Sequence, residues 1–367
     1  MEYKKIKLIF EDGTEISGKS FGAERSIAGE VVFNTAMTGY PESLTDPSYK
    51  GQILVLTYPI VGNYGVPVKV KENNLDKFFE SSTLHISGLV ISDYSEEYSH
   101  WNAEKSLGDW LKDHNIPGIF DVDTRKLTKM LREKGSMLGK IVYEEDLDFY
   151  DPNQDNLVSM VCTNEKQVYG NGKYKILLVD CGVKYNIIRY LLERDTTVIM
   201  VPWDYNFFKE EYDGLFISNG PGDPKKCDIT IDNLNKAFQQ DKPIFGICLG
   251  NQLMGLASGG DSYKLKYGHR SHNQPVIKVG TSQAYITSQN HGFAIDNDTL
   301  KTEWKPLFIN LNDETNEGMI HESKPFFSTQ FHPEASGGPT DTAFLFDEFI
   351  NRIKEFKGEE IELKSYL

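Results

Sequence analysis

The stretch that says most about the fold runs Pro243-Ile244-Phe245-Gly246-Ile247-Cys248-Leu249-Gly250-Asn251-Gln252. An apolar run typical of a buried strand leads into G-x-C-x-G, and a helical pattern follows over 252–257. This arrangement predicts a nucleophile elbow that carries cysteine in place of serine. Small residues at 246 and 250 allow the sharp turn. The helix start offers backbone N–H groups and a positive dipole end, which favour a thiolate.

A cysteine taken alone is more often a buried, inert thiol than a nucleophile. The flanking glycines and the strand-to-helix context favour the reactive interpretation for Cys248. The other cysteines lack that context, so we expect inert thiols at Cys162, Cys181 and Cys227. Four cysteines in 367 residues are too few for a disulfide framework.

Apolar runs and helical patterns alternate on both sides of the elbow in the C-terminal half. The strand-like runs lie at 176–179, 198–201, 214–218 and 243–247, and the helical patterns at 186–194 and 229–240. Such runs suit parallel strands buried on both faces, so we expect a doubly wound α/β domain over 174–360. Beyond Tyr263 strand patterns dominate, and a closing helix is predicted over 341–356.

The N-terminal half has a different pattern, with short β-like runs such as 5–10, 29–34 and 52–58 between Gly, Pro and Asp turns. We expect a β-rich N-terminal domain over 1–150, with one helix that opens at Asp123 and stops at Gly135. The segment 151–173 is rich in Asp, Asn, Gln and Gly, which predicts a linker. A short strand is expected around Cys162.

Composition excludes several classes of protein. Hydrophobic residues make up 39% and charged residues 25%, a balance typical of globular proteins, and the net charge of −15 disfavours nucleic acid and anionic membranes as partners. No apolar h-region follows Met1 and Glu2, and no run approaches the roughly 18 apolar residues of a membrane span. We therefore expect a cytoplasmic protein. Apart from the close pair His269 and His272 the histidines are scattered, which gives little support for a metal site.

The best candidate for a catalytic base is His332, in Ser328-Thr329-Gln330-Phe331-His332-Pro333-Glu334-Ala335. In an extended segment, residues two apart point to the same side, so Glu334 is placed to orient the imidazole while the ring faces Cys248. Alone, His332 would be an ordinary surface or core histidine. The nearby acid and the thiol favour a Cys-His-Glu triad, and His269, His272 and His321 gain no comparable support.

Two further segments are candidates for the wall of a pocket. Asn219-Gly220-Pro221-Gly222-Asp223-Pro224 follows a predicted strand, and its glycines allow close backbone approach or free N–H groups for an oxyanion. A plain turn is an equally good interpretation. The polar stretch Ser288-Gln289-Asn290-His291-Gly292-Phe293 lies between predicted strands and fits a hairpin loop as well as a binding segment.

Together, the elbow, the Asn-Gly-Pro-Gly-Asp loop and Phe331-His332-Pro333-Glu334 resemble the class I glutamine amidotransferase family. The resemblance implies that Cys248 attacks the side-chain amide of glutamine, that His332 shuttles protons and that Glu334 holds the imidazole. In the N-terminal half, the run from Asn34 to Tyr49, with Gly62-Asn63-Tyr64-Gly65 and Asp123-Thr124-Arg125, resembles the small-subunit family of carbamoyl phosphate synthetases.

The family resemblance also implies a set of glutamine contacts. They are Ser48, Gly220, Gly222, Leu249, Gln252, Asn290, Gly292 and Phe293. Unaided, Ser48 would be an ordinary turn serine, and its role implies a site closed between domains. Ser271 and His272 stand where the family usually carries glycines, which bears on the conformation of that loop and not on the triad.

A larger partner follows from what the chain lacks. It contains no GxxxxGK[ST] nucleotide loop, so ATP and magnesium are expected in a large synthetase subunit, with this chain as part of a heterodimer and no cofactor of its own. The resemblance implies an internal ammonia tunnel. Two other hypotheses are a non-catalytic structural subunit and a stand-alone cysteine hydrolase of γ-glutamyl compounds. The sequence does not decide between arginine and pyrimidine synthesis as the product's destination.

Overall fold

A computed structural model describes residues 3–361, so Met1 and Glu2, named above as the start of the chain, lie outside the described residues. The described chain clusters into two compact units. The first runs to Leu157 and includes Lys266–Ser271, and the second comprises Val158–Leu265 and the residues from His272 onward. None of the described helices is long and apolar enough to cross a membrane.

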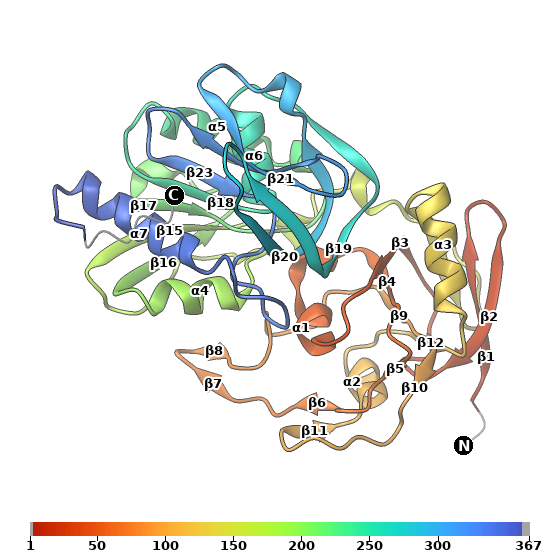
Figure 1. Cartoon of the computed structure of the whole chain (residues 1–367). Helices are drawn as coiled ribbons and strands as arrows, with labels where there is room; N and C mark the ends of the chain where they lie inside the picture. The colour runs from red at the N-terminus through yellow and green to blue at the C-terminus, as the bar shows by residue number, and fades with distance from the viewer. Residues whose placement is uncertain (1–2, 362–367) are drawn as a thin grey trace. The chain divides into compact units, whose positions relative to one another are not determined.

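The first unit is built around a closed barrel, with strand order β1-β13-β3-β4-β9-β12-β2 (Figure 1). Its strands are β1 (Lys5–Phe10), β2 (Glu15–Ser20), β3 (Ile27–Asn34), β4 (Gln52–Leu56), β9 (Gly88–Val90), β12 (Gly118–Phe120) and β13 (Met137–Val142). In β1 burial alternates, so Ile6, Leu8 and Phe10 point into the barrel. The β-rich N-terminal region predicted from the sequence is confirmed.

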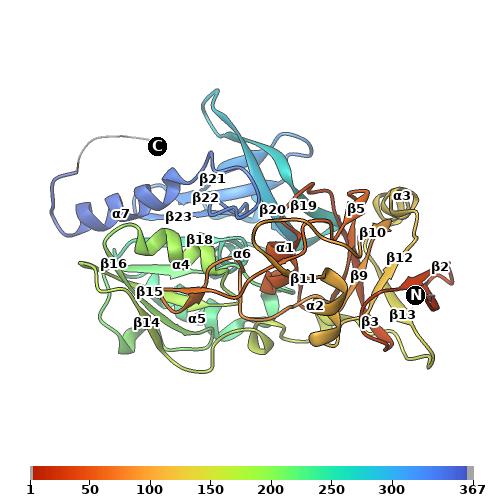
Figure 2. The same cartoon turned by 90° about the horizontal axis from the view of Figure 1, so that it is seen from below.

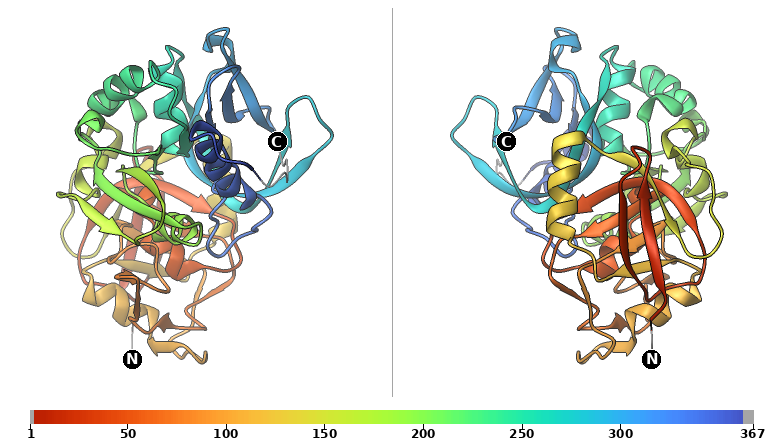
Figure 3. Two further views of the ribbon diagram at one scale, coloured as in Figure 1. Left: turned by 90° about the vertical axis from the view of Figure 1, so that its left-hand side faces the viewer. Right: turned by 90° about the vertical axis from the view of Figure 1, so that its right-hand side faces the viewer.

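The helix α3 (Thr124–Lys134) runs alongside the barrel strands (Figure 3). It begins where Asp123 Oδ1 accepts a hydrogen bond from Lys126 N at 2.8 Å, and it ends at Gly135, whose φ of 106° favours glycine. Leu127 and Leu131 are buried against the barrel core. The helix predicted between Asp123 and Gly135 is therefore confirmed at both ends.

The remaining elements of the first unit are short. They are α1 (Tyr40–Thr45), η1 (Pro47–Tyr49), β5 (Ile60–Val61), β6 (Val66–Pro67), β7 (Lys71–Glu72), β8 (Leu75–Asp76), β10 (Asp93–Tyr94), β11 (Ala103–Lys105), α2 (Leu107–Asp113) and η2 (Pro152–Gln154). The pairs β5–β10, β6–β11 and β7–β8 form small separate sheets outside the barrel.

The second unit contains a large mixed sheet, with strand order β14-β16-β15-β17-β18-β23-β22-β21-β19-β20 in the described residues. Its strands are β14 (Gln167–Tyr169), β15 (Tyr174–Asp180), β16 (Thr196–Pro202), β17 (Gly214–Ile217), β18 (Ile244–Ile247), β19 (Ser262–Lys278), β20 (Ala284–Ile295), β21 (Trp304–Asn310), β22 (Asn316–His321) and β23 (Phe326–Thr329). The core β16-β15-β17-β18-β23 is parallel. Strand order reverses between β15 and β17, and open α/β sheets bind ligands at the carboxyl ends of the strands beside such a point.

Helices cover both faces of this sheet, as predicted. They are α4 (Tyr185–Leu192), α5 (Asp228–Ala237), α6 (Leu249–Ala257) and α7 (Phe344–Phe356), with the 3-10 turns η3 (Val158–Met160), η4 (Phe207–Lys209), η5 (Pro224–Lys226) and η6 (Asn297–Thr299). Figure 2 shows α4 and α7 on the side of the sheet opposite α5. Phe346 of α7 stacks on Phe216 of β17, while Leu234 of α5 and Leu253 of α6 share a core with Leu215. The doubly wound arrangement is confirmed.

One local prediction was wrong, and one of two open interpretations is excluded. Cys162 lies in a bend after η3 and not in a strand, because the short edge strand β14 begins five residues later and pairs with β16. The stretch from Ser288 to Phe293, for which a hairpin loop was one of two interpretations, lies inside β20, so the hairpin loop is excluded. Its polar side chains find partners within the sheet, such as the bond from Gln289 Nε2 to Thr287 Oγ1 at 3.1 Å.

Candidate active site

Cys248 stands at the turn between β18 and α6, as the elbow motif predicts. Its φ of 54° and ψ of −102° place a non-glycine residue in the left-handed half of backbone space, a conformation that costs about 1–3 kcal/mol and that functional sites often retain. Two backbone bonds hold it, from Cys248 N to Thr329 O at 2.7 Å and from Gln252 N to Cys248 O at 3.2 Å. The residue is 2% exposed.

The glycines on either side of Cys248 are required by the packing of the turn. A Cβ on Gly246 would lie 2.7 Å from the backbone of Gly250, and a Cβ on Gly250 would lie 2.3 Å from the carbonyl oxygen of Ile217. Helix and strand therefore approach closely enough only with no side chain at either position. The G-x-C-x-G spacing has a steric origin.

His332 and Glu334 form a hydrogen bond, with 2.6 Å between His332 Nδ1 and Glu334 Oε1. Both side chains are buried. The contact was predicted from an extended segment, but these residues lie in a turn: Ala335 N donates to His332 O at 3.1 Å, and Ala335 has a φ of 47°. His332 N also donates to Ser288 O of β20, at 2.9 Å. The turn brings the carboxylate back to the ring.

The far side of the imidazole is placed to act on Cys248. His332 Nε2 is buried and has no hydrogen-bond partner of normal geometry, although Cys248 lies close enough to influence the ring. Burial alone would lower the pKa of His332, but the Glu334 carboxylate and Cys248 raise it above its ordinary value. A base that carries its proton readily beside a thiol favours a thiolate–imidazolium pair.

A buried lysine completes the charge balance of this cluster. Lys184, one residue before α4, places Nζ 3.0 Å from Glu334 Oε1 and 2.8 Å from the carbonyl oxygen of Ala335. Burial alone would raise the pKa of Glu334, but the charges of Lys184 and His332 lower it below its usual range. The carboxylate is therefore ionised at neutral pH. Sequence reasoning missed Lys184.

Several of the predicted glutamine-contact residues of the second unit lie near Cys248. The Cys248 sulfur lies 3.7 Å from Asn290 O, and Gln252 Nε2 donates to Phe293 O at 2.9 Å, with Gly292 between these two positions of β20. A Cβ on Gly220 would lie 2.7 Å from Leu249 Cδ2, so the Gly220 loop packs on the start of α6. Gly222 has a φ of 84°.

Ser48 belongs to the first unit, where it lies in η1 and is buried. Its backbone N–H donates to Asp46 Oδ1 at 2.9 Å, and this Asx-type cap fixes the turn after α1. Its contact with glutamine stays a prediction.

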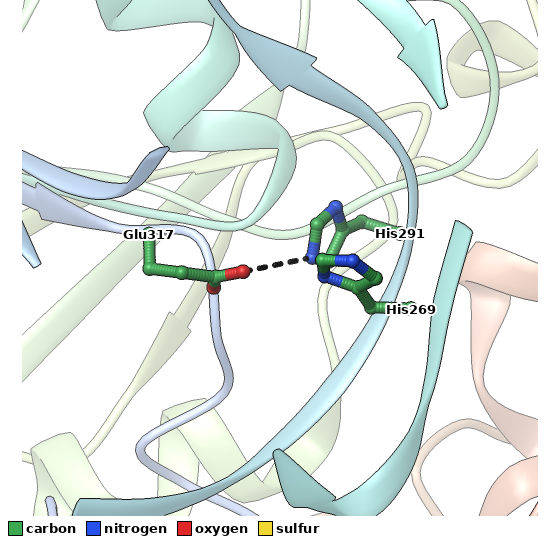
Figure 4. Close-up of side chains that lie close together, drawn as sticks. All are labelled: His269, His291 and Glu317. Carbon is green, nitrogen blue, oxygen red and sulfur yellow. Dashed lines mark ion pairs between the residues drawn. The ribbon is translucent and has the colours of Figure 1, made fainter. Parts of the chain in front are cut away.

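Contacts of His291 also hold β20 in place. His291, between Asn290 and Gly292, places Nε2 3.6 Å from Glu317 Oε1, and both side chains are buried (Figure 4). His291 Nδ1 lies 2.9 Å from Phe293 O, which also accepts from Gln252. These contacts fix the strand that lies against the Cys248 sulfur.

His272, which departs from the family pattern, lies close to the triad. Burial, together with the charges of Lys184 and His332, lowers its pKa to about 4. The ring is therefore neutral at pH 7. It packs beside Gly338, where a Cβ would lie 3.3 Å from His272 Cγ.

The other three cysteines have environments that suppress reactivity. Burial raises the pKa of Cys162 to about 11, that of Cys227 to about 12, and that of Cys181 well above its ordinary value. Neutral thiols are poor nucleophiles.

Two protein-family models match parts of this chain. Residues 177–352 match the family described as glutamine amidotransferase class-I, so the second unit carries a class I glutamine amidotransferase domain. Residues 8–141 match the CPSase domain of the carbamoyl-phosphate synthase small chain. The chain thus combines a small-chain CPSase domain with a class I glutamine amidotransferase domain, as the sequence resemblance predicted.

Curated relatives are about 50% identical in sequence to this chain. The mitochondrial carbamoyl-phosphate synthase [ammonia] of Mus musculus is 51% identical over 98% of this chain and 24% of its own length. The multifunctional protein URA2 of Saccharomyces cerevisiae is 50% identical over 97% of this chain and 18% of its own length. The multifunctional protein CAD of Squalus acanthias is 52% identical over 95% of this chain and 16% of its own length. The chain therefore spans a quarter or less of these relatives.

Proposed function

We propose that this chain is the glutaminase component of a glutamine-hydrolysing carbamoyl phosphate synthetase. It releases ammonia from L-glutamine and passes it to a larger ATP-binding synthetase component. The observation that carries the proposal is the arrangement of Cys248, His332 and Glu334, in which a buried carboxylate orients an imidazole that faces a thiol at a strained elbow.

The reaction begins with transfer of the Cys248 proton to His332 Nε2. The sulfur attacks the side-chain amide carbon of glutamine, the first N–H groups of α6 and the Gly220 loop stabilise the oxyanion, and His332 returns the proton to the leaving nitrogen. The C–N bond breaks, ammonia departs, and a glutamyl thioester remains. Water, deprotonated by His332, then attacks the thioester, so that the C–S bond breaks and glutamate is released with the thiol regenerated.

The wall of the site supports glutamine as the substrate. Asn290, Gly292 and Phe293 of β20, with Leu249 and Gln252 of α6, lie around the sulfur and offer backbone groups suited to an amino-acid substrate. Gly220, Gly222 and Ser48 complete the proposed glutamine contacts.

The name of one relative raises the question whether the nitrogen donor is glutamine or free ammonia. The mouse relative is named as an ammonia-dependent carbamoyl-phosphate synthase, so similarity to this family does not by itself fix glutamine as the donor. Support for glutamine comes from the side chains of this chain, because a thiol, an imidazole and a carboxylate in this order serve amide hydrolysis and have no use in binding free ammonia.

The partner is proposed on chemical grounds. The chain has no GxxxxGK[ST] loop, and its relatives are four or more times longer, so ATP, magnesium and bicarbonate chemistry is assigned to a larger component. Ammonia is protonated in neutral water and then loses its nucleophilicity. Direct passage through an internal tunnel avoids that loss.

The test uses the chain in complex with a large synthetase component. Cys248→Ser is expected to abolish carbamoyl phosphate synthesis from glutamine and to leave synthesis from ammonium salts unchanged, with Cys162→Ser as the matched control that retains both. Loss of both activities in Cys248→Ser would contradict this division of labour. A glutamyl thioester on Cys248, trapped by acid quench, would exclude a purely structural subunit. Full hydrolysis of γ-glutamyl substrates by the free monomer would favour a stand-alone hydrolase.

A further inference from the structure

A chain of buried polar side chains ends at the Cys248 sulfur. Ser328 Oγ donates to Asn251 Oδ1 at 2.7 Å, and Asn251 Nδ2 donates to Gln330 Oε1 at 3.1 Å. Gln330 Nε2 lies 3.6 Å from Cys248 Sγ, which is within hydrogen-bonding range for the large sulfur atom. Ser328, Asn251 and Gln330 are each 0% exposed, so bulk solvent does not reach these hydrogen bonds.

These contacts fix which end of the Gln330 amide faces the sulfur. Gln330 Oε1 accepts two hydrogen bonds, from Asn251 Nδ2 and from Gln252 Nε2 at 3.2 Å. The Asn251 amide is itself oriented, because its Oδ1 accepts from the Ser328 hydroxyl. A flipped Gln330 would set its NH₂ group against the NH₂ groups of Asn251 and Gln252, and the Gln252 amide cannot turn to suit it without losing the bond from its Nε2 to Phe293 O. The donor end of Gln330 therefore points at Cys248.

The sulfur lies between one acceptor and one donor. Asn290 O, at 3.7 Å, suits the neutral thiol, whose S–H donates to it. Gln330 Nε2 suits the thiolate, which only accepts. A buried anion without a donor is costly, and charge-assisted hydrogen bonds are about twice as strong as neutral ones.

We propose that the Gln330 carboxamide is the side-chain hydrogen-bond donor that stabilises the Cys248 thiolate once its proton has moved to His332, and that it orients the sulfur for attack. This role deepens the proposed glutaminase function, since it concerns the same nucleophile. The donor is preorganised by Asn251 and Gln252, so no reorientation is needed when the proton moves to His332.

The test measures the pH dependence of Cys248 alkylation by iodoacetamide, read by mass spectrometry of the Cys248 peptide. Gln330→Met keeps the volume and removes the donor, and we expect the alkylation midpoint to rise by about one pH unit, with alkylation about tenfold slower at pH 7. Gln330→Glu keeps the shape and aims a carboxylate at the sulfur, so its midpoint rises further. Cys162 in the same molecule is the internal reference, and its midpoint is expected to stay constant.

Gln289→Met is the matched control, because Gln289 is equally buried but bonds Thr287 and His291 and not the sulfur. Its Cys248 midpoint is expected to equal that of the wild type. Circular dichroism establishes that each variant is folded, and Gln330→Glu, the closest match in shape, decides the question if Gln330→Met does not fold. Unchanged midpoints in the Gln330 variants, or an equal rise in Gln289→Met, would overturn the proposal.

Alkylation needs no turnover, so the two proposals fail separately. A chain that hydrolyses no glutamine but shows the midpoint rise in Gln330→Met retains the donor role and loses the glutaminase function. A chain that hydrolyses glutamine and keeps the wild-type midpoint in Gln330→Met loses the donor role alone.

Discussion

Lys184 and Glu334 form a buried ion pair, with 3.0 Å between Nζ and Oε1 and side-chain exposures of 7% and 0%. The two residues come from opposite ends of the second unit's sequence and meet at the triad. The carboxylate oxygen that Lys184 contacts is the one that accepts from His332 Nδ1. One carboxylate thus joins the positive charge of Lys184 to the imidazole of His332, and the lysine keeps the carboxylate ionised.

Replacing Lys184 by Met leaves this buried carboxylate without its fixed counter-charge. We expect the free energy of unfolding at pH 7.5 to fall by about 3–5 kcal/mol, because removing Lys184 leaves the Glu334 charge buried without a counter-charge. The pKa of Glu334 rises in consequence. Urea denaturation measures the loss of stability.

The control for this change is Lys225→Met, which removes the exposed pair Lys225–Asp261 with its 2.7 Å contact. Exposed pairs contribute about 0–1 kcal/mol. If the two variants lose equal stability, Lys184 does not carry the role given to it. The double variant Lys184→Met/Glu334→Gln is expected to recover part of the loss.

The raised pKa of His332 predicts a pH dependence of stability. A group whose pKa is raised by folding stabilises the protein fully below its unfolded value, ordinarily 6.5, and loses that effect as the pH rises through its folded value. The stability difference between the wild type and His332→Gln should therefore shrink between pH 6 and pH 9. Its slope should approach about 1.4 kcal/mol per pH unit. Denaturation at several pH values measures this trend.

His272 serves as the control of opposite sign. Folding lowers its pKa to about 4, so its unfavourable effect appears as the pH falls below 6.5 and is absent above it. The wild type should lose stability relative to His272→Gln on acidification from pH 6.5 to pH 4. Trends of the same sign for both histidines would show that the two environments have been misassigned.

How much of the site could be predicted follows from how local each feature is. The elbow was predictable because an apolar run, two glycines and a helical pattern lie within 15 residues and act on one another directly. Gly250 packs closely against the distant residue Ile217. The turn could still be predicted, because the sequence only has to carry glycine at position 250 for this contact to form. The His332–Glu334 pair was also local, although a turn and not an extended segment makes the contact.

Features that depend on distant contacts were not predictable. Lys184 lies 151 residues before Ala335, and a lysine after a strand normally indicates a solvated surface. Gln330 lies inside the segment quoted for His332, yet only the packing of Asn251 and Gln252 tells which end of its amide faces the sulfur. The polar stretch around Asn290 left a hairpin loop and a binding segment equally open, because the partners that hold it in a strand, such as Glu317 for His291, lie in another strand.

The backbone of Cys248 predicts an unusual ranking of two inactive variants. At an ordinary position, glycine is about 0.5–1 kcal/mol less stabilising than alanine. At φ 54° this order should reverse, because alanine keeps the strain of a Cβ in the left-handed region and glycine does not. We expect Cys248→Gly to be more stable than Cys248→Ala by about 1 kcal/mol in urea denaturation, with glutamine hydrolysis lost in both. A more stable alanine variant would mean that the elbow is unstrained.

The close approach at Gly250 predicts that a side chain there disrupts the elbow by steric contact. This effect can be separated from the backbone strain that a side chain causes at a glycine of positive φ. A Cβ there would lie 2.3 Å from the carbonyl oxygen of Ile217, a backbone atom that cannot rotate away, so α6 must shift relative to β17. We expect Gly250→Ala to slow alkylation of Cys248 by iodoacetamide and to destabilise the second unit by more than about 2 kcal/mol. Gly280→Ala is the control, because Gly280 has a φ of 78° but nothing within 4 Å of an added Cβ. It should cost about 1–2 kcal/mol through backbone strain alone and leave alkylation of Cys248 at the wild-type rate. If Gly250→Ala behaves like Gly280→Ala in both measurements, steric closure is not what fixes the nucleophile.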